Sequence, residues 1–460
     1  MMTGIRILLL SREKFVRTFN LLWLVSISLL IGKENQFKIH SLLKDDVQDS
    51  LVAVIQQDPN PSIELNLESF SIQPDWAHYI KLDHQKKIDT LIVMATEEIK
   101  QPILNQIGSP LENTSIGQPF SKVSQTIHQR YYFLNREPIV DIGLVRADFL
   151  GAIIRLDPEF ESHFSGIFGM GKRGQSWAVT GQINLHLENL FQTAGFYELY
   201  WQRVDSLSQV IRFKVDEPHP FGWEVGGQWN YHHEVIKGLY SVIENQTLLQ
   251  MYLPGLHLVN LGYSAGKTIP TGAGEKNGYE TIGFKAFSFS SRRDSRNDRF
   301  FPNKGMMLFG SVDIGLQEGT GFMEGELELN YFHPIRHNFH GYLKYIGKGI
   351  RDFNHKVPKS RYYLFGGTST LRGYTEQQFS ATQYHISSLE IAYQPNSAFQ
   401  VDLFIDYGLT SIGNYMDGHT GVGVGLSQKT DQSIVKVQYA LPYGNALTQG
   451  KLHFKWISRL

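Results

Sequence analysis

Polar residues occupy every second position of the stretch Met323-Glu324-Gly325-Glu326-Leu327-Glu328-Leu329-Asn330-Tyr331. Successive side chains of a β-strand point to opposite faces, so this period of two predicts a strand with one wet face and one dry face. The same alternation recurs in residues 179–188, 211–215, 388–391, 401–407, 435–439 and 452–456. The chain from residue 161 to residue 460 is therefore expected to be mainly β, with about sixteen strands.

Two architectures produce this pattern: a soluble β-sandwich or propeller, and a membrane barrel with lipid outside and water inside. Tight turns are expected at residues 333–337 and 394–397, alternating with long polar loops at residues 291–298 and 348–359. Aromatic residues near the strand ends suit a membrane interface: Tyr197, Tyr200, Trp201, Trp223, Trp229, Tyr331, Tyr393 and Trp456. These features favour a transmembrane antiparallel β-barrel, which must close because lipid offers no partner to an unpaired strand edge.

Composition excludes several classes of protein. The 460 residues are 42% hydrophobic and 19% charged, yet beyond the N-terminus no apolar run reaches the length of a membrane helix. The formal net charge of −1 argues against nucleic acid as a partner, because phosphate-binding surfaces carry a basic excess. The absence of cysteine excludes thiol catalysis, cysteine zinc sites, disulfides and an N-terminal lipoprotein anchor.

The N-terminus has the pattern of an export signal. Basic residues between positions 6 and 17 precede an apolar stretch at residues 21–32, which is too short to span a bilayer. No small-x-small cleavage site follows this stretch, and a short buried helix is the alternative. We assign residues 1–35 to a signal peptide, and residues 36–87 to a periplasmic segment without an assigned fold.

Residues 88–160 have the pattern of a small α+β domain. A strand is expected at residues 88–94, a short helix at 102–107 ended by Gly108, and a longer helix with Pro119 in its first turn. The apolar face of the longer helix would consist of Phe120, Val123, Ile127, Tyr131 and Leu134. Two strands, at residues 139–145 and 149–156, are expected to follow.

The alternation also assigns faces to the strand at residues 401–407. Its apolar phase would face lipid, which places Asp402, Phe404 and Asp406 on the inner wall. Arg372 lies in a glycine-rich stretch, and an arginine inside a narrow barrel needs a charged partner such as the Asp406 carboxylate. The alternative is a surface arginine beside a turn, with an aspartate that is merely solvated.

Two segments resemble the signatures of a known family. They are Gly366-Gly367-Thr368-Ser369-Thr370-Leu371-Arg372-Gly373-Tyr374 and Phe404-Ile405-Asp406-Tyr407-Gly408. Together they resemble the bacterial surface antigen superfamily, the outer-membrane barrels that include BamA, TamA and the two-partner secretion transporters. Residues 299–306 resemble the family's segment leading into a mid-barrel strand. Leu371 replaces the commoner valine or isoleucine, and Leu460 replaces the usual final aromatic residue.

The resemblance implies a particular site. The loop carrying Gly366, Gly367, Leu371, Arg372, Gly373 and Tyr374 would fold back into the barrel lumen. Its arginine would meet Asp406 on the inner wall, beside Phe404 and Gly408. The first strand, near residues 164–172, and the last, residues 451–460, would close the barrel through a weak seam that includes Leu452, Phe454, Trp456 and Leu460. Residues 88–160 would be one POTRA domain, the periplasmic module preceding the barrel.

By the same resemblance the protein would act in outer-membrane protein assembly, insertion or translocation, without a cofactor and without enzymatic activity. Its partners would be unfolded outer-membrane or secreted protein clients, outer-membrane lipid, and periplasmic chaperones or accessory lipoproteins. Three alternatives remain open. They are a two-partner-type secretion pore, which usually carries two POTRA modules, a passive porin-like barrel, and a soluble β-rich enzyme.

Motifs that carry chemistry are weak elsewhere in the chain. Residues 262–268 resemble a phosphate loop but have one residue too few between their glycines. The alternate glycines of residues 421–425 suit close packing within a strand. His232 and His233 would point to opposite faces of a strand. We therefore expect neither catalytic residues nor a metal site.

Overall fold

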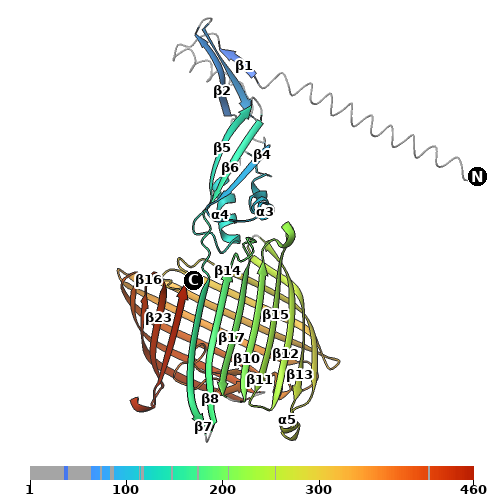
Figure 1. Cartoon of the computed structure of the whole chain (residues 1–460), viewed down its shortest axis with the longest axis vertical. Coiled ribbons are helices and arrows are strands. Elements are labelled where there is room, and N and C mark those ends of the chain that lie inside the picture. Colours follow the sequence, from blue (N-terminus) through green and yellow to red (C-terminus); the bar gives the residue numbers. More distant parts are fainter. Residues whose placement is uncertain are drawn as a thin grey trace, which may run out of the picture. The chain divides into compact units, whose positions relative to one another are not determined.

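The computed structural model describes residues 36–39, 64–72, 75–82, 87–112, 114–115, 119–146, 149–173, 176–205, 207–253, 255–412 and 415–459 (Figure 1). The predicted signal peptide, residues 1–35, lies outside these ranges. Within the described ranges, no helix combines the length and the apolar character needed to cross a bilayer. The chain forms two compact units.

The first unit contains the described residues up to Met94, together with those in the ranges Ile107–Gln125 and Pro138–Leu156. Its described residues contain two three-stranded sheets. β1 (Gln36–Ile39), β2 (Glu64–Ile72) and β3 (Asp75–Leu82) lie in the order β1-β3-β2. β4 (Thr90–Ala95), β5 (Ile139–Arg146) and β6 (Phe149–Leu156) lie in the order β4-β6-β5. Both sheets therefore place their last strand in the middle, and part of the segment left without a fold from sequence forms the first of them.

The helices α3 (Gln101–Glu112) and α4 (Phe120–Arg130) lie between β4 and β5 in the chain, in the predicted order. The expected helix stop at Gly108 is wrong. A Cβ atom added there would lie 2.6 Å from Cγ2 of Val93, so this glycine allows close packing against β4. The second helix is also shorter than predicted, because it ends before Tyr131 and Leu134. Buried side chains of the first unit include Val93, Ile107, Leu111, Leu150 and Ile154.

A closed barrel dominates the second unit (Figure 1). The described residues form sixteen antiparallel strands that pair in chain order, and the last pairs with the first. The strands are β7 (His163–Arg173), β8 (Ser176–Glu188), β9 (Phe196–Asp205), β10 (Ser208–Glu217), β11 (Gly226–Ile236), β12 (Tyr240–Leu253), β13 (His257–Pro270), β14 (Ile282–Asp294), β15 (Gly305–Gln317), β16 (Thr320–Arg336), β17 (Phe339–Asp352), β20 (Gln383–Asn396), β21 (Phe399–Ile412), β22 (Tyr415–Lys429), β23 (Ser433–Pro442) and β24 (Lys451–Arg459). The predicted barrel of about sixteen strands is confirmed.

The two faces of the barrel wall differ as the alternation predicts. On β21, Leu403 and Ile405 are 64% and 45% exposed on the outer face, whereas Asp402 and Asp406 are fully buried. An apolar outer face suits contact with lipid. Among the predicted interface aromatics, Tyr200 is an exception. Its ring lines the lumen, where the guanidinium carbon of Arg212 lies 4.2 Å from the ring centre.

The predicted alternation of tight turns and long loops is wrong. We call the rim where β7 begins and β24 ends the near rim. The tight turns β16–β17 and β20–β21 lie there, but so does the long connection of residues 295–304. A tight turn also joins β15 to β16 at the opposite rim, the far rim. The predicted polar loop at residue 291 starts too early because β14 pairs with β15 as far as Asp294.

The buried side chain of His219, at the near rim, joins the segment after α4 to the turn between β10 and β11. Its ring atom Nδ1 lies 2.7 Å from the carbonyl oxygen of Trp223, and Nε2 lies 2.6 Å from the hydroxyl of Tyr131. A carbonyl oxygen only accepts, so Nδ1–H of His219 donates to Trp223 and Nε2 accepts from Tyr131. Burial, aided by the positive charge of Arg130, lowers the pKa of His219 to about 4.

Acidification is expected to weaken this contact. Because the pKa of His219 is lower in the folded state, its stabilisation is fully present above the unfolded pKa of about 6.5 and is lost as the pH falls toward 4. The free energy of unfolding should fall by at most about 3 kcal/mol. It is measured as protease susceptibility of residues 126–137 across this pH range. His219→Gln removes the titrating group and should flatten the profile, and equal slopes in both proteins would contradict a neutral buried histidine.

Candidate functional site in the barrel lumen

The loop between β17 and β20, residues 353–382, lies inside the barrel. Its side chains contact inner-wall residues of β11, β12, β16, β20, β21 and β24. Within the loop, β18 (Tyr363–Phe365) pairs with β19 (Phe379–Ala381). Leu371 is fully buried in an apolar cluster with Phe365, Tyr384 and Ile386, which fixes the loop against the wall. We call residues 353–382 the lumen loop.

Arg372 is the centre of the polar contacts between the lumen loop and the wall. Its Nε and NH2 donate to the two carboxylate oxygens of Asp406 at 2.8 and 2.5 Å, and its backbone N–H donates to the same group at 3.0 Å. NH1 donates to Glu390 of β20 at 2.6 Å. Arg372 is 6% exposed, and both carboxylates are buried. The planar fork of arginine matches a carboxylate at two points, as this pairing requires.

Phe404 completes the pocket around the arginine. The guanidinium carbon of Arg372 lies 3.5 Å from the centre of the Phe404 ring, where the electron-rich face attracts a cation. Gly421 and Gly423 on the neighbouring β22 make room for these groups. A Cβ atom would lie 2.1 Å from the carbonyl oxygen of Arg372 at Gly421, and 2.3 Å from the Phe404 ring at Gly423. Both positions on the strand therefore require glycine.

Glycines of the lumen loop bend its backbone. Gly366, Gly367 and Gly373 have φ angles of +114°, +93° and +92°, in a region that side chains other than glycine rarely adopt. Gly408 of β21 faces Leu371, because an added Cβ atom would lie 3.1 Å from Cδ2 of that leucine. The hydroxyl of Tyr374 donates to the carbonyl oxygen of Thr420 at 3.1 Å. The motif thus combines turns, a buried apolar anchor and the arginine.

The lumen loop also contacts the last strand. Nδ1 of His453, on β24, lies 2.7 Å from the hydroxyl of Thr368. Nε2 of the same ring accepts from the backbone N–H of Gly373 at 3.4 Å. The loop that carries Arg372 is therefore bonded directly to one of the two strands at which the barrel closes.

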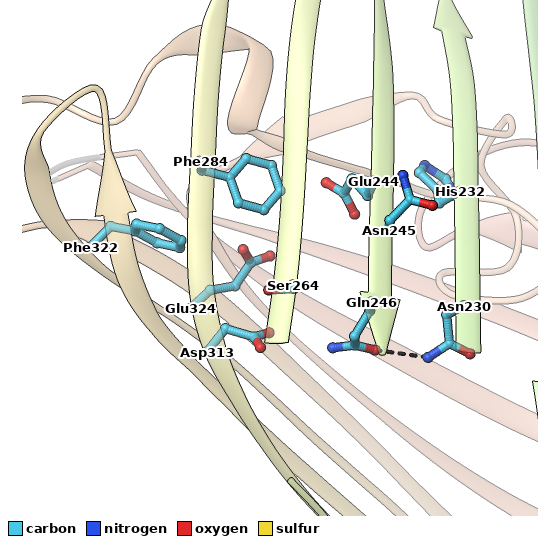
Figure 2. Close-up of a pocket in the computed structure, with 10 residues that line it drawn as sticks. All are labelled: Asn230, His232, Glu244, Asn245, Gln246, Ser264, Phe284, Asp313, Phe322 and Glu324. Carbon is cyan, nitrogen blue, oxygen red and sulfur yellow. Dashed lines mark hydrogen bonds between the residues drawn. The ribbon is translucent and has the colours of Figure 1, made fainter. Parts of the chain in front are cut away.

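A second arginine, Arg361, anchors the lumen loop on another part of the wall. It lies 2.6 Å from Glu324 of β16 and 3.4 Å from Glu244 of β12, and its guanidinium stacks 3.8 Å from the Phe284 ring centre. Both glutamates line one cavity of about 130 Å³. Figure 2 shows them together with the rings of Phe284 and Phe322, which line the same cavity. Sequence reasoning missed Arg361. No local motif marks it, since its acidic partners come from two distant strands.

The barrel closes through its shortest ladder. In the described residues β24 pairs with β7 at three positions, Ile457 with Ser165, Ser458 with Phe164 and Arg459 with His163. By comparison, β7 pairs with β8 at eleven positions and β21 with β22 at fourteen. We call the β24–β7 contact the seam.

The predicted seam residues are placed unevenly. Trp456 contacts Phe164 of β7 edge to face, with ring centres 6.4 Å apart. Leu452 and Phe454 pair with β23 but lie outside the three-residue ladder to β7. Leu460 lies outside the described residues. Among the described residues, no group of three or more metal-ligating side chains is arranged to hold an ion. The assembled contacts are those of a structural anchor.

A closed barrel with an apolar outer face, a polar inner wall and an inward-folded loop defines a transmembrane β-barrel protein. Residues 255–457 match the Omp85 superfamily domain. The matched part of the barrel, which runs from β13 into β24, is accordingly an Omp85-type domain.

Solved structures of this type have a similar fold. The structure resembles BamA from Haemophilus ducreyi lacking POTRA domains 1–3, with 13% identity, 91% of this chain and 94% of that chain covered, and a TM-score of 0.53. It resembles CdiB from Acinetobacter baumannii (12% identity, 90% and 80% covered, TM-score 0.54) and CdiB from Escherichia coli (12%, 91% and 84%, 0.55). No curated protein sequence matches the chain. Function must therefore be argued from its own residues.

Reversing the charge at the centre of the site should destabilise the barrel. Arg372→Glu would place three carboxylates together in a buried space, and losing one partner of a buried pair costs about 3–5 kcal/mol. We expect a lower yield of the compact, heat-modifiable form in detergent gels. Adding Asp406→Arg should restore it in part. Arg351→Glu, an equal charge change at an exposed position of β17, is the control. Unchanged yield in Arg372→Glu would contradict an anchoring role.

Proposed function

We propose that this protein inserts client polypeptides into the outer membrane by opening its seam. The observation that carries the proposal is the length of the closing ladder, three residue pairs where the neighbouring β7–β8 ladder has eleven. Opening the wall elsewhere would break many more backbone hydrogen bonds in a medium that cannot replace them. The seam is therefore the position where the wall opens at least cost.

The strands on both sides of the seam extend beyond the three pairs. β24 continues to Lys451 and β7 to Arg173, so each carries a backbone edge that the other does not pair along its whole length. Unpaired strand edges are templates for the addition of another strand. A client hairpin that pairs with these edges would satisfy its own backbone groups as it enters the lipid. This step needs no cofactor, because hydrogen bonding and lipid contact drive it.

The site around Arg372 would act in this mechanism by positioning. It fixes the lumen loop, and the loop in turn holds β24 through His453. The anchor would thus keep β24 in place as the strand exchanges partners. Its role is structural, since no reacting group contacts it.

A second candidate function is a secretion pore of the two-partner type. The observation that favours it is the second sheet in the first unit, because the orders β1-β3-β2 and β4-β6-β5 are the same. We propose that residues 88–160 form a POTRA-like domain in the periplasm and that β1, β2 and β3 belong to another. Two such modules are usual in two-partner transporters. Clients, outer-membrane lipid, and periplasmic chaperones or accessory lipoproteins are the partners of either function.

The experiment that separates these functions is a client-insertion assay. A urea-denatured model barrel is added to liposomes with and without the refolded protein, and its rate of folding is measured. The chain has no cysteine, so Ser165→Cys/Ile457→Cys places one disulfide across the seam. Acceleration should disappear in the oxidised variant and return on reduction. We expect opening of the seam to limit the rate of insertion. Because the crosslink joins no other pair of strands, a loss of acceleration can be assigned to the seam.

A matched pair in a long ladder is the control. Ser290→Cys/Ser311→Cys joins facing residues of β14 and β15, which pair at eleven positions. Oxidising this pair should leave the acceleration unchanged. Acceleration that survives the seam crosslink would contradict insertion through the seam. An absence of acceleration together with steady conductance would favour the secretion pore or a passive porin.

A further inference from the structure

The connection between β14 and β15, residues 295–304, is a folded segment. The Asp298 carboxylate accepts from the backbone N–H groups of Phe300 and Phe301, each at 2.8 Å. The side-chain oxygen of Asn297 accepts from the backbone N–H of Asn303 at 3.1 Å and of Lys304 at 2.9 Å. These bonds give the segment a defined shape independent of its external contacts. We call residues 295–304 the rim strap.

Gly305 ends the rim strap with a conformation that requires glycine. Its φ angle is +102°, and a Cβ atom there would lie 2.1 Å from the carbonyl oxygen of Ser295. The start and end of the strap are thereby brought together, since the backbone N–H of Ser295 donates to Met306 at 2.8 Å. A closed base directs the middle of the strap away from its own strands.

The rim strap reaches strands on the other side of the barrel mouth. In the ring of sixteen strands, β14 and β15 are as far from the seam as two neighbouring strands can be. Yet Asp298 Oδ2 lies 2.6 Å from Nζ of Lys429 on β22, and Arg299 NH1 lies 3.0 Å from Glu188 on β8. The ring of Phe300 packs edge to face on His163, the first residue of β7, at 5.1 Å. These contacts require the strap to cross the mouth at the near rim.

Contacts of the rim strap lie on both sides of the seam. Arg299 NH2 donates to the carbonyl oxygen of Glu159, ahead of β7, at 3.2 Å. Glu161 lies between two arginines, 3.8 Å from Nε of Arg299 and 3.2 Å from NH2 of Arg459 on β24. The guanidinium of Arg459 also lies 5.7 Å from the Phe300 ring centre. An ionic network therefore joins the strap, the start of β7 and the end of β24.

We propose that the rim strap covers the near mouth of the barrel and latches the seam, which opens when the strap is displaced. The network sits beside the three backbone pairs of the seam, since Arg459 is itself one of the paired residues. Releasing Arg299 would leave Glu161 with a single cation and would remove the cross-mouth contact. The proposal rests on the proposed function in one respect, that an open seam admits a client.

Cysteine reactivity at the seam tests the latch without any client. Ser165 is 7% exposed and pairs with Ile457, so the rate at which a maleimide modifies Ser165→Cys reports how often the seam opens. Arg299→Gln should raise this rate about tenfold, because charge-assisted contacts to Glu188 and Glu161 are lost. The reference position is Ser290→Cys on β14, which is equally buried, and its rate should not change.

Lys429→Ala is the decisive variant. Lys429 lies on β22 and contacts the rim strap, whereas two strands, β23 and β24, separate it from Ser165 in the wall. Its loss should raise the Ser165→Cys rate roughly threefold, as expected for one partly exposed ion pair. The control Lys436→Ala removes a lysine of β23 that faces Asp402 and not the strap, and should have no effect. This variant keeps the test valid if Arg299→Gln fails to fold.

The outcomes separate the latch from the proposed function. An unchanged Ser165→Cys rate in folded Lys429→Ala would overturn the latch, and so would an equal rise at Ser290→Cys, which indicates general loosening. A selective rise at Ser165→Cys supports it. If the rate rises selectively while no variant accelerates client folding, the latch stands and the insertion function fails.

Discussion

Every backbone N–H and C=O group inside lipid must find its partner within the protein, and the whole barrel depends on this constraint. Fifteen of the sixteen barrel ladders in the described residues satisfy it with between eight and fourteen pairs. The seam has three. Other contacts must therefore hold β24 and β7 together, and they do so with side chains. Trp456 packs on Phe164, and Glu161 binds Arg459.

The lumen loop is held by charges that the barrel wall has removed from water. Arg372 has two carboxylates and an aromatic ring around it, and Arg361 has the same kinds of partner on different strands. A buried arginine without these partners would be very unfavourable. The cost of leaving the charge unpaired in another loop position therefore exceeds the net stabilisation that the ion pairs give to the observed position. Two such anchors on separate parts of the wall restrict the loop to one placement. The buried side chain of Leu371 adds an apolar contact to the same effect.

Local patterns predicted what local geometry controls. The period of two assigned the faces of β21, including Asp402 and Asp406, because side-chain direction in a strand depends only on the neighbours. The resemblance to a known family predicted the contact between Arg372 and Asp406. The contacts of Arg361 and of the rim strap could not be predicted from sequence. Their partners, such as Glu188 for Arg299, come near only when the ring of strands closes. The role of Gly108 was missed because glycine is favoured both at the end of a helix and at a close contact between elements. The sequence alone does not distinguish the two.

The position of the seam pairs explains why a rim strap is an effective latch. All three pairs lie at the near rim, where β7 begins and β24 ends, and the remaining edges of both strands extend toward the far rim. Edges without a ladder add little resistance to separation, so the near rim holds the closed state. His453 lies near the start of β24, toward the far rim, and binds the lumen loop. That strand therefore keeps one fixed point when the seam pairs separate. Contacts of Arg299 at the near rim therefore act on the few bonds that decide whether the wall is closed.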